Sequence, residues 1–303
     1  MCVVHLVYAR QYAVHQDLHL GSGQSFYSSN IAAGCTISLR AQRSAFSSGT
    51  IFKEPPSDDP YPQDTSNMKG TIAVEEAIID QAGVEAHTFA QFQSLMRPGS
   101  DETSGLSAHE KRLLDIHDER LKKMDEHGVE YMLLSLTSPG VQGEADAEKG
   151  KKMAQVANDY LAGEVKKNPK RFGALAALSM HNAKDAAEEL RRAIKELGMF
   201  GGLVNDFQSK GAEAYEKVYF DTPEYESFWQ TVQELDVPIY FHPRYAIPQD
   251  LAAGTKYGDR RHLLGAGVQF HLDLSWHLYA ICSSGIFDRF PKVQIVAGHL
   301  GEG

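Results

Sequence analysis

The chain has 303 residues, of which 42% are hydrophobic and 23% charged, and a formal net charge of −10. This composition is typical of globular proteins, and the acidic balance argues against nucleic acid and anionic membranes as partners. Cys2, Cys35 and Cys282 are too few and too scattered for a disulfide framework, which favours a reducing, cytoplasmic location. No apolar run reaches the roughly 18 residues of a spanning helix, so we expect no membrane partner.

Residues 1–67 differ in composition from the rest of the chain. The first part is rich in Ser, Gly and Ala, and four prolines follow between Pro55 and Pro62. Such a density of proline excludes helix and sheet. We therefore expect residues 1–67 to be a disordered or extraneous extension with a proline-rich linker, and residues 68–303 to form the folded domain.

From Thr71 onward, apolar strand-like runs alternate with amphipathic helical stretches. The pattern predicts strands at 71–77, 129–136, 172–178, 201–206, 238–242 and 293–297. It predicts helices at 107–127, 145–168, 184–197, 222–235 and 274–287. This alternation is typical of βα units in a parallel α/β sheet. The six strands suit either an open doubly wound sheet or an incomplete (β/α)8 barrel. No Gly-x-Gly-x-x-Gly follows the first strand, which argues against a dinucleotide-binding fold.

Acidic and imidazole side chains stand at the ends of these predicted strands, where a barrel places its chemistry. His242 closes an apolar strand, and Pro243 then stops the ladder. Glu75 and Glu76 must face opposite sides of their strand, and we choose Glu75 as the inward residue. Carboxylate and imidazole together suit Zn²⁺, Mn²⁺ or Mg²⁺. The alternatives are a solvated carboxylate at Glu75 and a hydrogen-bonded core histidine at His242.

His299 follows the last predicted strand and is flanked by glycines that allow a tight turn. Glu302, three residues later, could fix the tautomer of this ring and leave the other nitrogen for proton transfer. The alternative is a histidine held by a backbone carbonyl beside an exposed glutamate.

Two further polar residues lie at the same predicted edge. Arg244 could bind a substrate carboxylate, and the alternative is a surface arginine. Asn205 could contact a substrate, and the alternative is a residue that caps a turn. His271 and His277 lie on or near the last helix without a paired ligand spacing, so we expect them to be packing or surface residues.

Eight short segments follow one another in order along the chain: IAVEEA (72–77), LSMHN (178–182), LVNDFQ (203–208), FWQT (228–231), LDVP (235–238), HPR (242–244), GIFDRFPK (285–292) and GHLGE (298–302). Together they resemble decarboxylases of the amidohydrolase superfamily, above all the fungal 2,3-dihydroxybenzoate decarboxylases. The resemblance runs from Met68 to Gly303, and residues 1–67 have no counterpart in it.

The resemblance implies a metal-dependent (β/α)8 barrel that removes CO₂ from ortho-hydroxylated benzoates without an organic cofactor. Glu75 and His242 match metal ligands, and His299 and Glu302 match the catalytic histidine and its carboxylate partner. The implied partners are a small aromatic carboxylic acid and further copies of the chain, in a homodimer or homotetramer.

The chain departs from this family after Gly303, where an aspartate ligand, a substrate-binding arginine and two βα units would follow. We therefore expect an incomplete barrel with little activity unless a partner completes it. Two alternatives to the decarboxylase are a metal-dependent hydrolase of the same superfamily and an inactive barrel fragment with a binding role. The hydrolases usually carry His-x-His where this chain has Glu75-x-Ala77, which disfavours the first alternative.

Overall fold

The computed structural model describes residues 4–6, 70–81, 83, 108–211, 214 and 216–301. Two parallel sheets contain most of the described strands, with orders β1-β10-β9-β6-β5 and β2-β3-β4. The strands of these sheets are β1 (Val4–Leu6), β2 (Thr71–Ile78), β3 (Val129–Leu136), β4 (Phe172–Ala174), β5 (Ala176–Ala177), β6 (Gly202–Asn205), β9 (Pro238–His242) and β10 (Gln294–Ala297). An antiparallel hairpin, β7 (Gln208–Lys210) and β8 (Glu216–Val218), follows β6.

The two sheets meet where the chain passes from β4 to β5. The Leu175 N–H donates to the Leu134 carbonyl of β3, and the next N–H, of Ala176, donates to the Gly201 carbonyl beside β6, both at 2.9 Å. The single strand predicted at 172–178 is therefore split, because its neighbour changes at Leu175. The two sheets therefore form one continuous parallel wall with the strand order β2-β3-β4/β5-β6-β9-β10-β1. In this order β2 and β10 are far apart.

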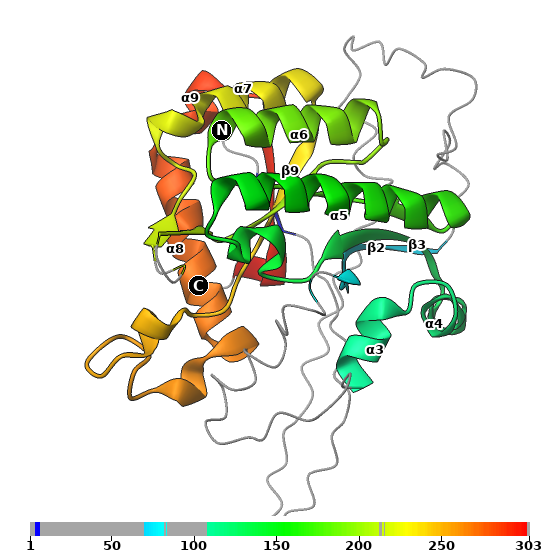
Figure 1. Cartoon of the computed structure of the whole chain (residues 1–303), viewed down its shortest axis with the longest axis horizontal. Helices are drawn as coiled ribbons and strands as arrows, with labels where there is room; N and C mark the ends of the chain where they lie inside the picture. The colour runs from blue at the N-terminus through cyan, green and yellow to red at the C-terminus, as the bar shows by residue number, and fades with distance from the viewer. Residues whose placement is uncertain are drawn as a thin grey trace, which may run out of the picture. The chain divides into compact units, whose positions relative to one another are not determined.

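Helices cover the outer face of this wall. Figure 1 shows α5, α6 and α7 stacked side by side across the strands, with α8 at one flank. The described helices are α3 (Ala108–Leu114), α4 (Glu119–His127), α5 (Ala147–Lys167), α6 (Ala183–Lys195), α7 (Glu226–Leu235), α8 (Gln269–Ser283) and α9 (Ile286–Arg289). Asp146 and Asn182 cap α5 and α6, since each side chain accepts a backbone N–H of the first turn.

The core between helices and strands is aromatic near α7 and α8. Trp229 and Phe241 are fully buried and stack with ring centroids 6.3 Å apart. The Trp229 indole donates to the Phe220 carbonyl at 2.9 Å, so its one polar atom is satisfied. Phe241 therefore points toward the helices. Its neighbours Tyr240 and His242 point to the other face of β9, on the inner side of the wall.

Two predicted helices differ from the observed ones. The helix predicted at 107–127 is divided into α3 and α4, because the Asp115 carboxylate accepts the backbone N–H groups of Asp118 and Arg120 at 3.1 and 2.9 Å. The helix predicted at 274–287 begins earlier, at Gln269, and ends at Ser283. Gly285, with φ of 77°, then separates it from α9.

Strand β1 was not predicted. Val4 and Leu6 pair with Ile295 and Ala297 of β10 in a parallel ladder. Residues 4–6 lie inside the segment 1–67, and the expectation that this segment is a disordered or extraneous extension stays a prediction. The remaining residues of 1–67, including the proline-rich linker, lie outside the described residues.

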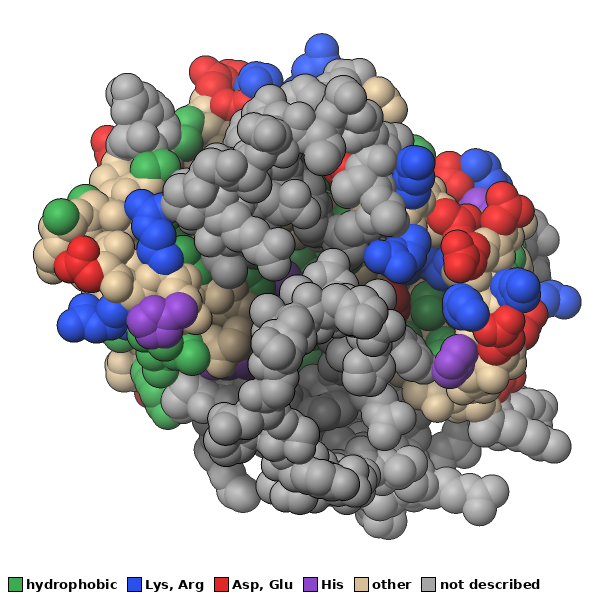
Figure 2. Space-filling model, turned by 90° about the horizontal axis from the view of Figure 1, so that it is seen from below, with side chains coloured by type: hydrophobic (Ala, Val, Ile, Leu, Met, Phe, Trp, Pro, Cys, Tyr) green, Lys and Arg blue, Asp and Glu red, His purple; other side chains and the backbone are tan. Residues whose placement is uncertain are grey.

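Within the described part of the chain, no helix is long and apolar enough to cross a membrane. Figure 2 shows Lys and Arg side chains interspersed with Asp and Glu side chains on the face that it presents. The described residues of this face therefore form no broad basic patch.

Asn158 provides a test of how α5 is attached to the wall. It is fully buried; its Nδ2 donates to the Ala177 carbonyl at 2.9 Å and to the Glu189 carboxylate at 2.7 Å, and its Oδ1 accepts the Ala177 N–H at 2.8 Å. Asn158→Ala leaves these buried groups without partners, and we expect it to lower the free energy of unfolding by about 2–4 kcal/mol.

The control is Asp159→Asn at the next position, which weakens an exposed ion pair with Arg192. That change should cost less than about 1 kcal/mol. Urea unfolding measures both values, and equal small losses in the two variants would contradict the structural role of Asn158.

Candidate metal centre

Three side chains from three different strands converge at one end of the wall. Glu75 lies on β2, His242 is the last residue of β9, and His299 follows β10. The Glu75 Oε1 atom lies 3.2 Å from His242 Nε2 and 3.0 Å from His299 Nε2. The two Nε2 atoms lie 3.1 Å apart. Among the described residues this is the one group of three or more His, Cys, Asp or Glu side chains that could hold a metal ion.

The local structure of β2 separates the two neighbouring glutamates. The ladder between β2 and β3 shifts its register between Ala73 and Glu76. Glu75 faces the histidines, whereas the Glu76 carboxylate lies 3.4 Å from the Arg120 guanidinium. The structure therefore places Glu75, the residue chosen from strand alternation, in the cluster and leaves Glu76 outside it.

The charge of Glu75 suits a cation. Burial alone would raise the pKa of this carboxyl, but hydrogen bonds from His242 and His299 lower the pKa to about 2. The side chain is only 9% exposed, so an ionised carboxylate stands in a largely water-free place at neutral pH.

The ring of His242 is held in the tautomer that a metal ligand needs. Its Nδ1 lies 2.5 Å from the Pro243 carbonyl oxygen. Because a carbonyl only accepts hydrogen bonds, Nδ1 carries a proton, and Nε2 is the ring nitrogen left to bind an ion in place of its contact with Glu75.

The spacing of the three atoms also fits one ion. Ligand atoms about 2.1 Å from an octahedral ion lie roughly 3 Å from one another. Carboxylate oxygen with imidazole nitrogen is a ligand set for Zn²⁺, Mn²⁺ or related divalent ions. The residues present therefore fit a divalent metal.

A tyrosine that the sequence analysis missed touches this cluster. The Tyr240 hydroxyl donates a hydrogen bond to Glu75 Oε2. Strand alternation holds the signal that could have identified it, because Tyr240 lies two residues before His242 and so on the same face of β9.

Arg244 is not the surface arginine that was one of the two expectations. It is buried, with Nη1 donating to the carbonyls of Gln142 and Phe207 at 3.1 and 2.8 Å and Nη2 donating to Ser209 Oγ at 3.0 Å. Burial lowers the pKa of its guanidinium to about 10. None of these partners belongs to the Glu75 cluster, and the expectation that Arg244 binds a substrate carboxylate stays a prediction.

Asn205 lies beside the cluster on the neighbouring strand, where it pairs with His242 in the β6–β9 ladder. Its Nδ2 donates to the Pro139 carbonyl at 3.1 Å. Its Oδ1 is buried and has no hydrogen-bond partner among the described residues. A buried amide oxygen of this kind can accept a hydrogen bond from a ligand hydroxyl. Contact of Asn205 with a substrate stays a prediction.

Glu302, the expected carboxylate partner of His299, lies outside the described residues. His277, expected to be a packing or surface residue, is fully buried. Its Nε2 accepts the Phe220 N–H at 3.1 Å and its Nδ1 lies 3.2 Å from an Asp206 carboxylate oxygen. It contributes no atom to the metal-ligand group.

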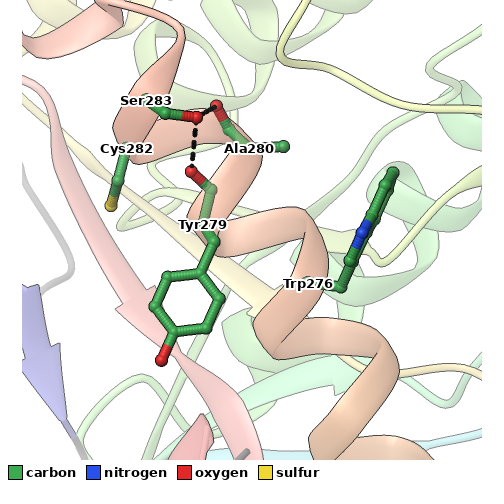
Figure 3. Close-up of a pocket in the computed structure, with 5 residues that line it drawn as sticks. All are labelled: Trp276, Tyr279, Ala280, Cys282 and Ser283. Carbon is green, nitrogen blue, oxygen red and sulfur yellow. Dashed lines mark hydrogen bonds between the residues drawn. The ribbon is translucent and has the colours of Figure 1, made fainter.

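A separate pocket of about 560 Å³ lies along α8, as Figure 3 shows, and is lined by Trp276, Tyr279, Ala280, Cys282 and Ser283. In Figure 3 the hydroxyl of Ser283 bonds to the backbone oxygens of Tyr279 and Ala280. This lining has no carboxylate or imidazole, so the Glu75 cluster is the better candidate for chemistry.

Comparison with known proteins places the chain in a family. The sequence model of the amidohydrolase family matches residues 86–303. A γ-resorcylate decarboxylase of Polaromonas sp. (strain JS666) is 45% identical over 237 residues, covering 78% of this chain and 68% of that protein. A 2,3-dihydroxybenzoate decarboxylase of Aspergillus niger is 28% identical over 171 residues, covering 44% of this chain and 58% of that protein.

A solved structure gives the same result. The crystal structure of a dihydroxybenzoic acid decarboxylase from Polaromonas sp. JS666, with bound manganese and the inhibitor 2-nitroresorcinol, matches with a TM-score of 0.67 and 38% identity. The match covers 78% of this chain and 67% of that one.

The chain therefore belongs to the amidohydrolase family. Within it, the chain is similar to the hydroxybenzoate decarboxylases, which confirms the resemblance and the barrel-type fold predicted from the sequence.

The neighbouring residues Glu75 and Glu76 allow a matched test of whether the cluster binds a metal ion. Glu75→Gln removes the charge of a carboxylate that faces His242 and His299, and we expect Mn²⁺ affinity to fall by at least about 10-fold. Glu76→Gln removes the same charge from the residue that faces Arg120 and should leave the affinity within about 3-fold, because its carboxylate offers no atom to the ion. Titration of the metal-free protein by calorimetry measures both. Equal losses would contradict the assignment of Glu75.

Proposed function

We propose that this protein is a divalent-metal-dependent decarboxylase that releases CO₂ from an ortho-hydroxybenzoate. The observation that carries the proposal is the convergence of Glu75 Oε1 with the Nε2 atoms of His242 and His299 within 3.2 Å. The relatives supply the reaction class, because the γ-resorcylate decarboxylases that are 44–45% identical to this chain cover up to 78% of it.

Glu75 and His242 would hold the ion. The carboxylate is ionised, and the proton on Nδ1 of the imidazole leaves Nε2 as the atom that would bind the cation. Manganese in the similar Polaromonas structure favours Mn²⁺ among the candidates. A bound divalent ion would stabilise negative charge on the substrate carboxylate and the neighbouring phenolic oxygen.

His299 would supply the proton. Its Nε2 lies close to Glu75 Oε1 and His242 Nε2, so a substrate held there would place its ring beside this imidazole. Transfer of one proton from His299 to the ring carbon that carries the carboxylate forms a C–H bond. The C–C bond to the carboxylate then breaks, its electron pair returns to the ring, and CO₂ leaves. We propose that Glu302 assists His299 by accepting from its other nitrogen.

The substrate would carry a hydroxyl next to its carboxylate. The more similar relative is a γ-resorcylate, or 2,6-dihydroxybenzoate, decarboxylase, and the less similar one acts on 2,3-dihydroxybenzoate. We therefore propose 2,6-dihydroxybenzoate ahead of 2,3-dihydroxybenzoate, with the unpaired Oδ1 of Asn205 accepting a phenolic hydroxyl.

The chain spans 58–68% of the length of the γ-resorcylate decarboxylases that it matches. A metal-dependent hydrolase and an inactive binding protein are the competing functions. The relatives that are 44–45% identical to this chain are named decarboxylases, which disfavours the hydrolase. Measuring bound metal and CO₂ release distinguishes an inactive binding protein from an enzyme. The homo-oligomeric state and the cytoplasmic location stay predictions.

Substrate analysis tests the reaction class. With Mn²⁺ present, 2,6-dihydroxybenzoate should yield CO₂ and resorcinol, and chelation of the ion should abolish this release by removing the charge that stabilises the reacting carboxylate. The matched control is 3,5-dihydroxybenzoate, which has the same two hydroxyls but none next to the carboxylate, and it should give no CO₂. Release that survives chelation, or equal turnover of the two isomers, would contradict the proposal.

Substitution of His299 tests whether this residue donates a proton or binds the metal. We expect His299→Ala to keep its bound Mn²⁺ and to lower the rate of CO₂ release by about 10²–10⁴-fold, the usual contribution of a general acid. His242→Ala should lose both metal and activity. The metal content of the purified variants distinguishes the two roles. Loss of metal from His299→Ala would show that His299 is a metal ligand and contradict the proposed role as proton donor.

A further inference from the structure

We propose that Tyr240 is a positioning residue that orients the Glu75 carboxylate for metal binding. This inference rests on the proposed metal centre and adds a residue to it. The Tyr240 hydroxyl donates to Glu75 Oε2, whereas the histidines approach Oε1. The two oxygens of one carboxylate therefore have different partners.

The phenol ring is held in place by its surroundings. Tyr240 is 3% exposed and lies in an apolar cluster. Leu175 and Leu203 are the other buried members, and Val74, Leu133 and Val296 pack against them. Because aliphatic side chains surround the ring, its hydroxyl has a defined position before any ion arrives.

Gly298 gives an independent indication that this position is built into the fold. A Cβ atom at residue 298 would lie 2.7 Å from Tyr240 Cε1, 2.8 Å from the Phe241 carbonyl oxygen and 3.0 Å from the Tyr240 hydroxyl. The Tyr240 ring and the Phe241 carbonyl together thus fill the space that any larger residue would need at 298. Gly298 also directly precedes His299, so the same ring lies against the turn that delivers the third side chain of the cluster.

Tyr240 therefore contacts all three strands that form the centre. It belongs to β9, two residues before His242; it bonds to Glu75 of β2; and it packs on Gly298 at the end of β10. Hydrogen-bonded partners of metal ligands typically change metal affinity by about 10–100-fold. Because the phenol holds Oε2, Oε1 stays directed at the imidazoles. Binding an ion then costs less conformational entropy, since the carboxylate is already in place.

The test is Tyr240→Phe, which removes one oxygen and keeps the ring. Calorimetric titration of the metal-free protein with Mn²⁺ should give a dissociation constant about 10–100-fold higher than that of the unaltered chain. Tyr131→Phe is the matched control: Tyr131 is also buried, at 4% exposure, and donates to the Phe172 carbonyl at 2.9 Å, outside the cluster. It should leave Mn²⁺ affinity within about 2-fold, because its hydroxyl touches no ligand of the proposed centre.

A second variant approaches the same contact from the other side. Gly298→Ala must displace the Tyr240 ring or the Phe241 carbonyl, and it should also weaken Mn²⁺ binding while leaving Glu75 and the histidines in the chain. A folded Tyr240→Phe protein that binds Mn²⁺ as tightly as the unaltered chain overturns the role of Tyr240 and leaves the metal centre standing.

Two other results complete the test. If the unaltered chain binds no Mn²⁺, both this inference and the proposed function are wrong. If Tyr240→Phe does not fold, a crystal structure of the Mn²⁺ complex of the unaltered chain decides. A hydrogen bond from Tyr240 to Glu75 supports the inference, and a Glu75 carboxylate turned away from Tyr240 overturns it.

Discussion

One constraint governs this structure: a buried carboxylate must stay close to two imidazoles that come from other strands. Glu75 is 9% exposed, yet its pKa is lowered to about 2, because hydrogen bonds from His242 and His299 outweigh its burial. A buried negative charge is costly unless cationic or hydrogen-bonding groups surround it. The parallel alignment of β2, β9 and β10 provides those groups, since parallel strands bring their carboxyl ends to one edge.

Much of the fold and part of the site followed from periodicity. The strand predicted at 238–242 is β9 as observed, because β-branched and aromatic residues bounded by proline define both ends. Alternation chose Glu75 over Glu76, and the structure turns the second carboxylate toward Arg120. The convergence of Glu75, His242 and His299 followed from a rule about strand ends, which needs no knowledge of side-chain packing.

Features set by particular side-chain contacts were not predictable in this way. The side-chain bonds of Asp115 that divide α3 from α4 compete locally with helix hydrogen bonds, and no period in the sequence reports them. Arg244 is buried against the carbonyls of Gln142 and Phe207, residues distant in sequence. Tyr240 packs against Gly298, where a Cβ atom would meet its ring, and the sequence pattern of one strand does not report such a contact between two segments.

The most direct test of the account is anomalous scattering at the manganese edge from crystals of the protein grown with Mn²⁺. The account predicts one strong peak about 2.0–2.3 Å from a Glu75 oxygen and from Nε2 of His242, within the same group as His299. A structure with no peak there, or with manganese bound only elsewhere on the chain, would contradict it.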